Sequence, residues 1–246
     1  MLPMIRSEFR KLSTVRAPWL LLAAGPLLVV AGITGLIQSG GNVHDPAVQG
    51  KALGHVALAA LFTLIFGIFA VAGEYRHATI TDTFLSFPAR GRVAAAKLAV
   101  YGAAGAAAGL ISSAVAVAVT AAWWAAKGGS FDFSAAGTWQ TIGGGVAVNI
   151  AFAAIGVGVG ALIRNLAAAI AAALAWIAVV EGIVGQVLGS GLARWLPFGA
   201  SEALGRAAGI GPSKLLPQWG GGVLLAGYAA AFAAAAIVTT LRRDVT

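Results

Sequence analysis

The sequence holds one carboxylate within a long apolar run, where few other groups could do chemistry. Glu181 interrupts the run from Asn165 to Ala193, and Asn149 and Gln186 are strongly polar residues in similar surroundings. A carboxylate inside a membrane-spanning segment is costly and by default functional. If the run enters a bilayer at Asn165, however, Glu181 lies about 24 Å along the helix, near the outer leaflet. Glu181 is therefore either a substrate or proton site or a structural hydrogen-bonding group.

Motifs of the common enzyme classes are missing from the chain. No G-x-x-x-x-G-K-[ST], G-x-S-x-G or H-E-x-x-H occurs, so a P-loop, a nucleophile elbow and a zinc-protease site lack their usual residues. There is no cysteine, and the three scattered histidines have no metal-ligand spacing. Gly156, Gly158 and Gly160 lack the spacing of a dinucleotide-binding motif and suit close helix packing. The sequence predicts no catalytic residue, no metal ion and no cofactor on this chain.

A polar island, GEYRHATITDTFLSFPARGR, spans residues 73–92 of this apolar chain. Ile80, Phe84 and Phe87 recur at helical spacing and predict a short helix with an apolar stripe, which Pro88 ends. Polar residues surround that stripe: Glu74, Tyr75, Arg76, Thr79, Asp82, Thr83 and Arg90. An exposed apolar stripe with mixed charges around it fits a groove on a partner protein. The alternative is a solvated loop.

The composition that surrounds these residues is that of a membrane protein. Of the 246 residues, 59% are hydrophobic and only 10% are charged, against roughly 25% charged in soluble domains. Six apolar stretches are long enough to cross a bilayer as helices, at about residues 17–38, 53–73, 98–124, 139–163, 165–188 and 219–241. We therefore predict one all-α membrane domain over residues 1–246, with six transmembrane helices.

The basic residues are distributed unevenly between the predicted loops. With the N-terminus inside, eleven of the 16 Lys and Arg residues lie on the cytoplasmic side and five lie outside. The positive-inside rule then places both termini in the cytoplasm, and we expect a multi-pass protein of a bacterial cell membrane. The net charge of +8 does not indicate nucleic-acid binding, because no basic run is interleaved with aromatic residues.

The first 16 residues are amphipathic and precede the first predicted span. Apolar side chains recur at helical spacing and basic ones occupy the other face, the residues concerned being Ile5, Phe9 and Leu12, and Arg6, Arg10 and Lys11. Such a helix lies in the membrane interface, in contact with lipid. It acts either as a basic anchor or as an elbow that cradles a partner.

Residues 189–217 form a long connection before the last predicted span. The stretches RWLPF and SEALGR predict short helices broken by Gly and Pro, and aromatic residues there suit the membrane interface. We expect a re-entrant or surface-lying hairpin on the outer face. A plain extracellular loop is the alternative.

A pattern of nine residues runs from the end of the second predicted span into the third. Its members are Glu74, Tyr75, Arg76, Thr79, Ile80, Thr83, Pro88, Arg90 and Lys97. This pattern resembles the type-2 ABC exporter permease family, in which Glu-Tyr-Arg, Thr-Ile, Thr and Pro-x-Arg follow the second span. The segment RWLPFGA, residues 194–200, is similar to the outer segment of that family. With the six-span layout, the resemblance covers essentially the whole chain.

The resemblance implies a small drug- or antibiotic-efflux permease that is half of a transporter and not itself an enzyme. Two permease chains, identical or closely homologous, would pair around a central pathway, and two separate ATPase subunits would bind ATP and Mg²⁺. The helix of the island would be the coupling helix that receives the ATPase, and residues 1–16 would be an elbow helix. Alternating access would export an amphipathic or hydrophobic drug, antibiotic or lipid-like substrate.

Two other functions are compatible with the residues alone. An ion- or proton-coupled carrier would use Glu181 and would need no ATPase. A membrane interaction or sensor protein would transport nothing. Transport by the chain alone in proteoliposomes would favour the carrier, whereas a co-purifying ATPase would favour the permease.

Overall fold

The computed structural model describes residues 1–14, 16–207 and 215–242, which form helices joined by short connections, with no strand among them. Six helices are long and apolar enough to cross a membrane: Trp19–Gln38, Pro46–Arg76, Arg90–Ala126, Thr138–Ile163, Leu166–Val187 and Gln218–Val238. We call them spans one to six in chain order. The prediction of an all-helical chain with six candidate spans is confirmed.

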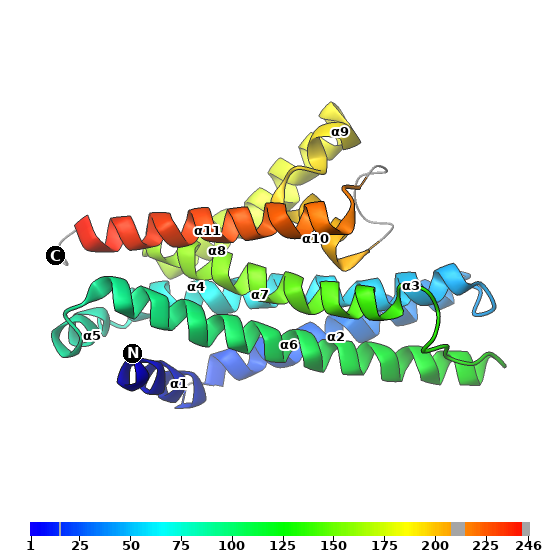
Figure 1. Cartoon of the computed structure of the whole chain (residues 1–246), viewed down its shortest axis with the longest axis horizontal. Helices are drawn as coiled ribbons and strands as arrows, with labels where there is room; N and C mark the ends of the chain where they lie inside the picture. Colours follow the sequence, from blue (N-terminus) through cyan, green and yellow to red (C-terminus); the bar gives the residue numbers. More distant parts are fainter. Residues whose placement is uncertain (15, 208–214, 243–246) are drawn as a thin grey trace.

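The helical elements and their bounds explain how each span is built (Figure 1). In chain order they are α1 (Leu2–Thr14), α2 (Arg16–Gln38), α3 (Pro46–Gly54), the 3-10 turn η1 (His55–Ala59), α4 (Ala60–Arg76), α5 (Ile80–Ser86), α6 (Arg90–Ala126), α7 (Thr138–Ile163), α8 (Leu166–Ala175), the π-helical stretches η2 (Trp176–Glu181) and η3 (Val184–Leu188), α9 (Ser190–Ala193), α10 (Pro197–Gly205) and α11 (Gln218–Arg242). Span two combines α3, η1 and α4, and span five combines α8, η2 and η3.

Two spans begin earlier than their apolar stretches predict. Span two begins at Pro46, because the Asp45 side chain accepts a hydrogen bond from the Ala47 amide at 2.9 Å and proline suits the first helical position. Span three begins at Arg90, about two turns before the apolar stretch, since Arg and Lys are good helix formers. Hydrophobicity alone does not mark such polar first turns.

Glycines bring α7 against its neighbours at the centre of the bundle. A Cβ atom on Gly156 would collide with the Leu64 carbonyl of α4, and one on Gly67 would collide with the Ala153 carbonyl of α7. On the side of α7 that faces α6, a Cβ atom on Gly105 of α6 would lie 2.7 Å from the backbone carbonyl oxygen of Asn149. Small residues in apolar helices allow such close backbone approach. Many glycines of spans two to four therefore serve helix packing, as the sequence predicts for spans three and four, whereas Gly102 and Gly143 have no neighbour within 4 Å of an added Cβ atom.

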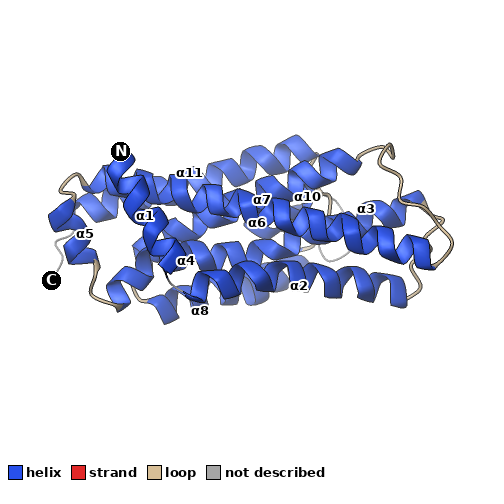
Figure 2. Cartoon of the chain, turned by 90° about the horizontal axis from the view of Figure 1, so that it is seen from below, coloured by secondary structure: helices blue, strands red, loops and turns tan. Residues whose placement is uncertain are grey.

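An even number of spans returns the chain to the end where it started. The helices α1 and α5 and the C-terminal end of α11 lie at one end of the bundle, which we call the α5 end (Figures 1 and 2). The start of α3 and the connection between α6 and α7 lie at the opposite end. This arrangement agrees with the predicted loop order.

Span five leans out of the bundle beyond its first turns (Figure 1). Arg164, with a left-handed φ of 57°, ends α7, and the Asn165 side chain caps α8 by accepting from the Ala168 amide at 3.0 Å. The π-helical stretches Trp176–Glu181 and Val184–Leu188 follow, and such wide turns are frequent at functional sites. Most of the described side chains in this span are exposed.

The connection before span six contains two helices, α9 and α10. Pro197 opens α10, which packs against α7, α11 and η1 and buries most of its residues. The described part is therefore a packed helix rather than a plain loop. The predicted hairpin also includes residues 208–214, which lie outside the described residues.

Candidate functional site

Polar side chains of four elements meet in one buried group at the α5 end, which we call the charge cluster. Its members are Glu8 and Lys11 of α1, Glu74 of α4, Thr83 of α5 and Lys97 of α6. Every ion pair within 4.0 Å between two described residues belongs to this cluster. The cluster is thus the main electrostatic connection between the ends of these helices.

Lys97 is the most buried cation of the charge cluster, with 2% of the residue exposed. Its Nζ donates to Glu8 Oε2 at 2.8 Å, to Glu74 Oε1 at 2.7 Å and to the Ala70 carbonyl at 2.8 Å. An ammonium group has three donors, so all of them are satisfied. Since an unpaired buried ammonium costs several kcal/mol, these contacts fix α6 to α1 and α4.

Lys11 is half-buried and makes a second set of three contacts. Its Nζ donates to Glu74 Oε1 at 2.6 Å, to Glu8 Oε1 at 2.8 Å and to Thr83 Oγ1 at 3.1 Å. Burial lowers the pKa of Lys11, but the hydrogen bonds and charges of Glu74 and Glu8 more than offset this effect, so the pKa is raised. Lys11 therefore stays charged at neutral pH.

The two glutamates bridge the two lysines. Each carboxylate oxygen of Glu8 accepts from a different lysine, whereas Glu74 Oε1 accepts from both. The other oxygen, Glu74 Oε2, lies 3.3 Å from the Thr83 hydroxyl, which also lies 3.1 Å from the Thr79 carbonyl. Two positive and two negative charges balance, so the cluster is a neutral, fully bonded network.

Helix periodicity explains why these residues converge. Glu8 and Leu12 are one turn apart on α1 and are both buried, so that face of α1 carries a carboxylate into the bundle. Glu74 lies in the last turn of α4 and is still buried, at 8% exposure. On α5, Ile80 and Thr83 share the buried face. The hydroxyl of Thr83 is thereby turned toward Glu74.

The apolar stripe of α5 faces the protein's own helices. Ile80 is 4% exposed, Phe84 and Phe87 are half-buried, and the Arg90 guanidinium lies 5.1 Å from the centre of the Phe84 ring. The expectation that this stripe is exposed to a partner is therefore corrected for Ile80. Because α5 has only seven residues between short connections, it lies against the helix ends and buries Ile80 and Thr83 there. Its exposed face carries Thr81, Asp82, Leu85 and Ser86, and Leu85 is 75% exposed.

The remaining residues of the island lie around the charge cluster. Tyr75 is half-buried, and the Arg164 guanidinium lies 5.2 Å from the centre of its ring. Arg76 and Thr79 are exposed, and the exposed Asp82 lies in the first turn of α5, where a carboxylate suits the helix dipole. These side chains lie around α5 and take no part in the hydrogen bonds of the charge cluster.

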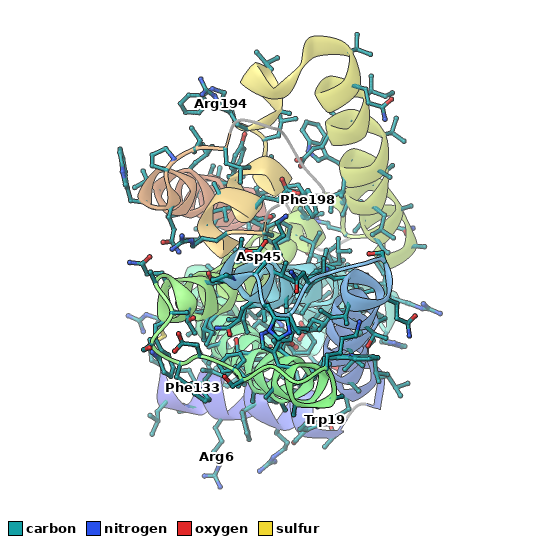
Figure 3. The ribbon with its side chains drawn as sticks, turned by 90° about the vertical axis from the view of Figure 1, so that its right-hand side faces the viewer. Arg6, Trp19, Asp45, Phe133, Arg194 and Phe198 are labelled. Atoms are coloured by element: carbon teal, nitrogen blue, oxygen red, sulfur yellow. The ribbon has the colours of Figure 1, made fainter. Side chains whose placement is uncertain are left out.

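The predicted faces of α1 are rearranged in the structure. Ile5 and Leu12 pack against the bundle, whereas Phe9 is 65% exposed. Arg6 and Arg10 are exposed, and Figure 3 shows Arg6 pointing away from the bundle. Lys11, which periodicity places on the basic outer face, turns inward instead, because Glu8 and Glu74 attract it.

The polar residues of the spans occupy three different settings. Glu181 is 8% exposed and accepts hydrogen bonds from the amides of Phe198 at 2.9 Å and Gly199 at 3.3 Å, in the first turn of α10. These bonds have the geometry that the structural hydrogen-bonding alternative requires, since the first amides of a helix need such acceptors. Asn149 donates to the Val56 carbonyl at 3.3 Å and so joins α7 to η1. Gln186 is exposed.

Two buried carboxylates, Glu8 and Glu202, were not predicted from the sequence. Glu8 sits in a basic amphipathic stretch, and its spacing of three residues from Lys11 is the signal that could have marked an inward-facing pair. Glu202 sits in a segment predicted as a hairpin, where nothing in the sequence indicates burial. Among the described residues, no three His, Cys, Asp or Glu side chains lie together as a metal site would require.

Comparisons with known proteins add no assignment to this arrangement. The chain matches no protein-family model, and no curated protein matches it significantly. A function for the chain is therefore inferred from its own residues and their geometry.

Proposed function

We propose that the chain is the membrane-spanning permease subunit of an ATP-binding-cassette exporter. Two copies, or one copy with a close homologue, would pair in the membrane, and two separate ATPase subunits would dock at the α5 end and hydrolyse ATP with Mg²⁺. Closure of the ATPases would open the pathway outward for an amphipathic or hydrophobic substrate. The six candidate spans, the short helix between spans two and three and the residue pattern of the island support this proposal.

The attachment of α5 to three other helices is the observation that carries the proposal. Thr83 of α5 contacts Glu74 at the end of α4 and Lys11 of α1, and Lys97 extends the same network to α6. A displacement of α5 therefore acts on the ends of spans two and three. In this proposal α5 is the coupling helix and α1 is the elbow helix, and the charge cluster joins them.

The exposed face of α5 is the proposed docking surface for the ATPase. Leu85 is its large apolar residue, and the exposed Thr81, Asp82 and Ser86 lie beside it. Interfaces often place one apolar anchor in a pocket and surround it with polar contacts. This face takes the docking role, while Ile80, Phe84 and Phe87 hold α5 against the chain itself.

Co-purification of the tagged full-length chain from its native membranes tests the docking role. We expect ATP hydrolysis by a P-loop ATPase to elute with the parent chain and to fall at least tenfold with Leu85→Asp. Leu192→Asp is the matched control, because Leu192 is 55% exposed on α9, away from the α5 end. Both leucines are exposed, so the substitutions should leave folding intact, which size-exclusion chromatography checks. Equal ATP hydrolysis in all three eluates would contradict docking through α5.

An ion- or proton-coupled carrier is the second candidate, because Glu181 and Glu202 are both buried carboxylates. Proteoliposomes that contain only this chain separate the two functions. Transport that follows a proton or cation gradient without ATP, and that is lost in Glu181→Gln, would favour the carrier. An exporter subunit should show no such transport.

A further inference from the structure

An apolar cavity of about 330 Å³ lies between span five and the rest of the bundle. Its walls come from α4, α7, α8, η2, α10 and α11, and include Leu64, Phe152, Ile155, Trp176, Ile177 and Phe232. The volume lies within the range of small-molecule sites, which are concave and mostly apolar with few polar groups. Because span five leans out of the bundle, the cavity is positioned to receive a molecule from the membrane (Figure 1).

Glu181 is the charged residue in the wall of this cavity. Its carboxylate is 8% exposed and accepts hydrogen bonds from the amides of Phe198 and Gly199. These neutral donors orient the carboxylate but leave its charge uncompensated. An apolar cavity with a carboxylate in its wall differs from an apolar groove filled by a lipid chain, because it attracts molecules of one charge sign.

Glu202, in the second turn of α10, is a second buried carboxylate. The residue is 2% exposed, and neither of its carboxylate oxygens has a hydrogen-bond partner in the described part of the chain. Burial and the nearby charge of Glu181 raise the pKa of Glu202 to about 7. Glu202 lines a smaller neighbouring cavity rather than the one that Glu181 lines, and the two carboxylates influence each other through their charges.

No cation of the described residues neutralises this pair. All ion pairs between described residues belong to the charge cluster at the α5 end. Lys51 and His55 line a small cavity beside Glu202, of about 30 Å³, but neither lies within ion-pair distance of its carboxylate. A buried carboxylate without a cation is costly, and a bound cation would remove that cost.

We propose that this cavity binds a lipophilic cation, with its apolar body against α4, α7 and α11 and its charge held at Glu181, whose negative field the neighbouring Glu202 reinforces. Trp176 and Tyr228 also line the cavity, and a ring face turned toward the ligand would favour the same charge sign, since ring faces attract cations. Lipophilic cations thereby become the substrate class of the proposed exporter. The assignment as cargo rests on that proposed function, whereas binding itself needs no ATPase.

The test uses two probes of the same shape and opposite charge, tetraphenylphosphonium and tetraphenylborate. Their equilibrium binding is measured on the full chain in lipid nanodiscs, with empty nanodiscs to subtract partition into lipid. We expect the chain to bind the phosphonium at least tenfold more tightly than the borate. Glu181→Gln and Glu202→Gln should each weaken phosphonium binding about tenfold. Glutamine at position 181 keeps an oxygen that can accept from the α10 amides, and Glu202 has no hydrogen bond to lose within the described part of the chain, so the fold should persist.

Two further variants separate charge from shape. Asp132→Asn removes an exposed carboxylate between α6 and α7 and should leave phosphonium binding unchanged. Ala173→Trp places a large side chain in the cavity wall and should abolish binding without changing charge. Equal affinity for both probes, or unchanged phosphonium binding in both glutamate variants, would overturn the proposal. Failure to bind the cation would overturn the cation site but not the proposed docking of an ATPase. Failure to dock an ATPase would overturn the proposed function but not the cation site.

Discussion

Lys97 Nζ lies 2.7 Å from Glu74 Oε1, and this buried pair joins the beginning of α6 to the last turn of α4. The same oxygen of Glu74 accepts from Lys11, and its other oxygen faces Thr83 of α5. Glu74 is therefore the residue through which α1, α4, α5 and α6 are connected. Any change in the position of α5 has to be accommodated at this carboxylate.

Replacing Lys97 by methionine should strongly destabilise the chain. Lys97→Met keeps a similar length but leaves Glu8 and Glu74 with only the half-buried Lys11, and breaking a buried ion pair costs roughly 3–5 kcal/mol. The midpoint of thermal unfolding in nanodiscs measures the effect. Arg92→Met is the matched control, because Arg92 is an exposed cation near the start of the same helix. Equal midpoints for the two variants would show that the pair contributes no stability.

Removing the Thr83 hydroxyl should weaken coupling more than folding. Thr83→Val keeps the shape of the side chain but leaves Lys11 and Glu74 each without one contact. If α5 is the coupling helix, ATP hydrolysis by the docked ATPase should lose its stimulation by substrate, while co-purification persists. Thr83→Ser, which retains the hydroxyl, should restore stimulation. Normal stimulation in the valine variant would mean that the cluster does not transmit the movement of α5.

A methyl group at Gly156 should disturb the contact between α4 and α7. The added Cβ atom would collide with the Leu64 carbonyl, and overpacking of this kind typically costs about 1–3 kcal/mol. Gly143→Ala on the same helix is the control, since nothing lies within 4 Å of its added Cβ atom. We expect a lower thermal midpoint for Gly156→Ala only. Equal midpoints would indicate that the helices can shift apart freely.

The stability of the chain should decrease between pH 5 and pH 8 because of Glu202. Its pKa is raised from 4.5 to about 7 by burial and by the charge of Glu181, so the folded chain binds this proton more tightly than the unfolded chain. The resulting stabilisation is complete below about pH 4.5 and is lost as the pH rises through about 7.

Thermal midpoints at pH 5.5 and pH 8 check this prediction. Glu202→Gln should have a flatter pH dependence and should exceed the parent chain in stability at pH 8. Asp132→Asn should keep the slope of the parent, because hydrogen bonds from Ser134 lower the pKa of that exposed carboxyl out of this range. A glutamine variant with the parent's slope would assign the pH dependence to another group.

The spans could be predicted from sequence because apolar length is a local property. The fourth predicted span, residues 139–163, differs from α7 (Thr138–Ile163) by one residue at its start. The charge cluster could not be predicted in the same way, because Glu8 and Lys97 are far apart in the chain and meet only when three helices pack. Periodicity also misplaced Lys11, since electrostatic attraction to two glutamates outweighs the preference of a lysine for the outer face.

The connection before span six gives a second example, because the burial of its residues could not be predicted from the local sequence. Glu202 belongs to a short stretch with both polar and small residues, which reads as a surface helix when it is considered alone. Its burial follows from the packing of α10 against α7 and α11, with small residues such as Ala200 and Ala203 next to Gly221 of α11. The local sequence does not indicate that α7 and α11 pack against this stretch.

The distance along the chain between Glu8 and Lys97 sets an order of assembly. The partners are 89 residues apart, and synthesis proceeds from the N-terminus, so α1 is complete long before α6 exists. Until span three has been inserted, Lys97 is not available as a partner, so the Glu8 carboxylate is more stable in water. An amphipathic helix at the membrane surface can keep this carboxylate hydrated during that interval. The first segment to be made therefore reaches its final position only after span three has been made.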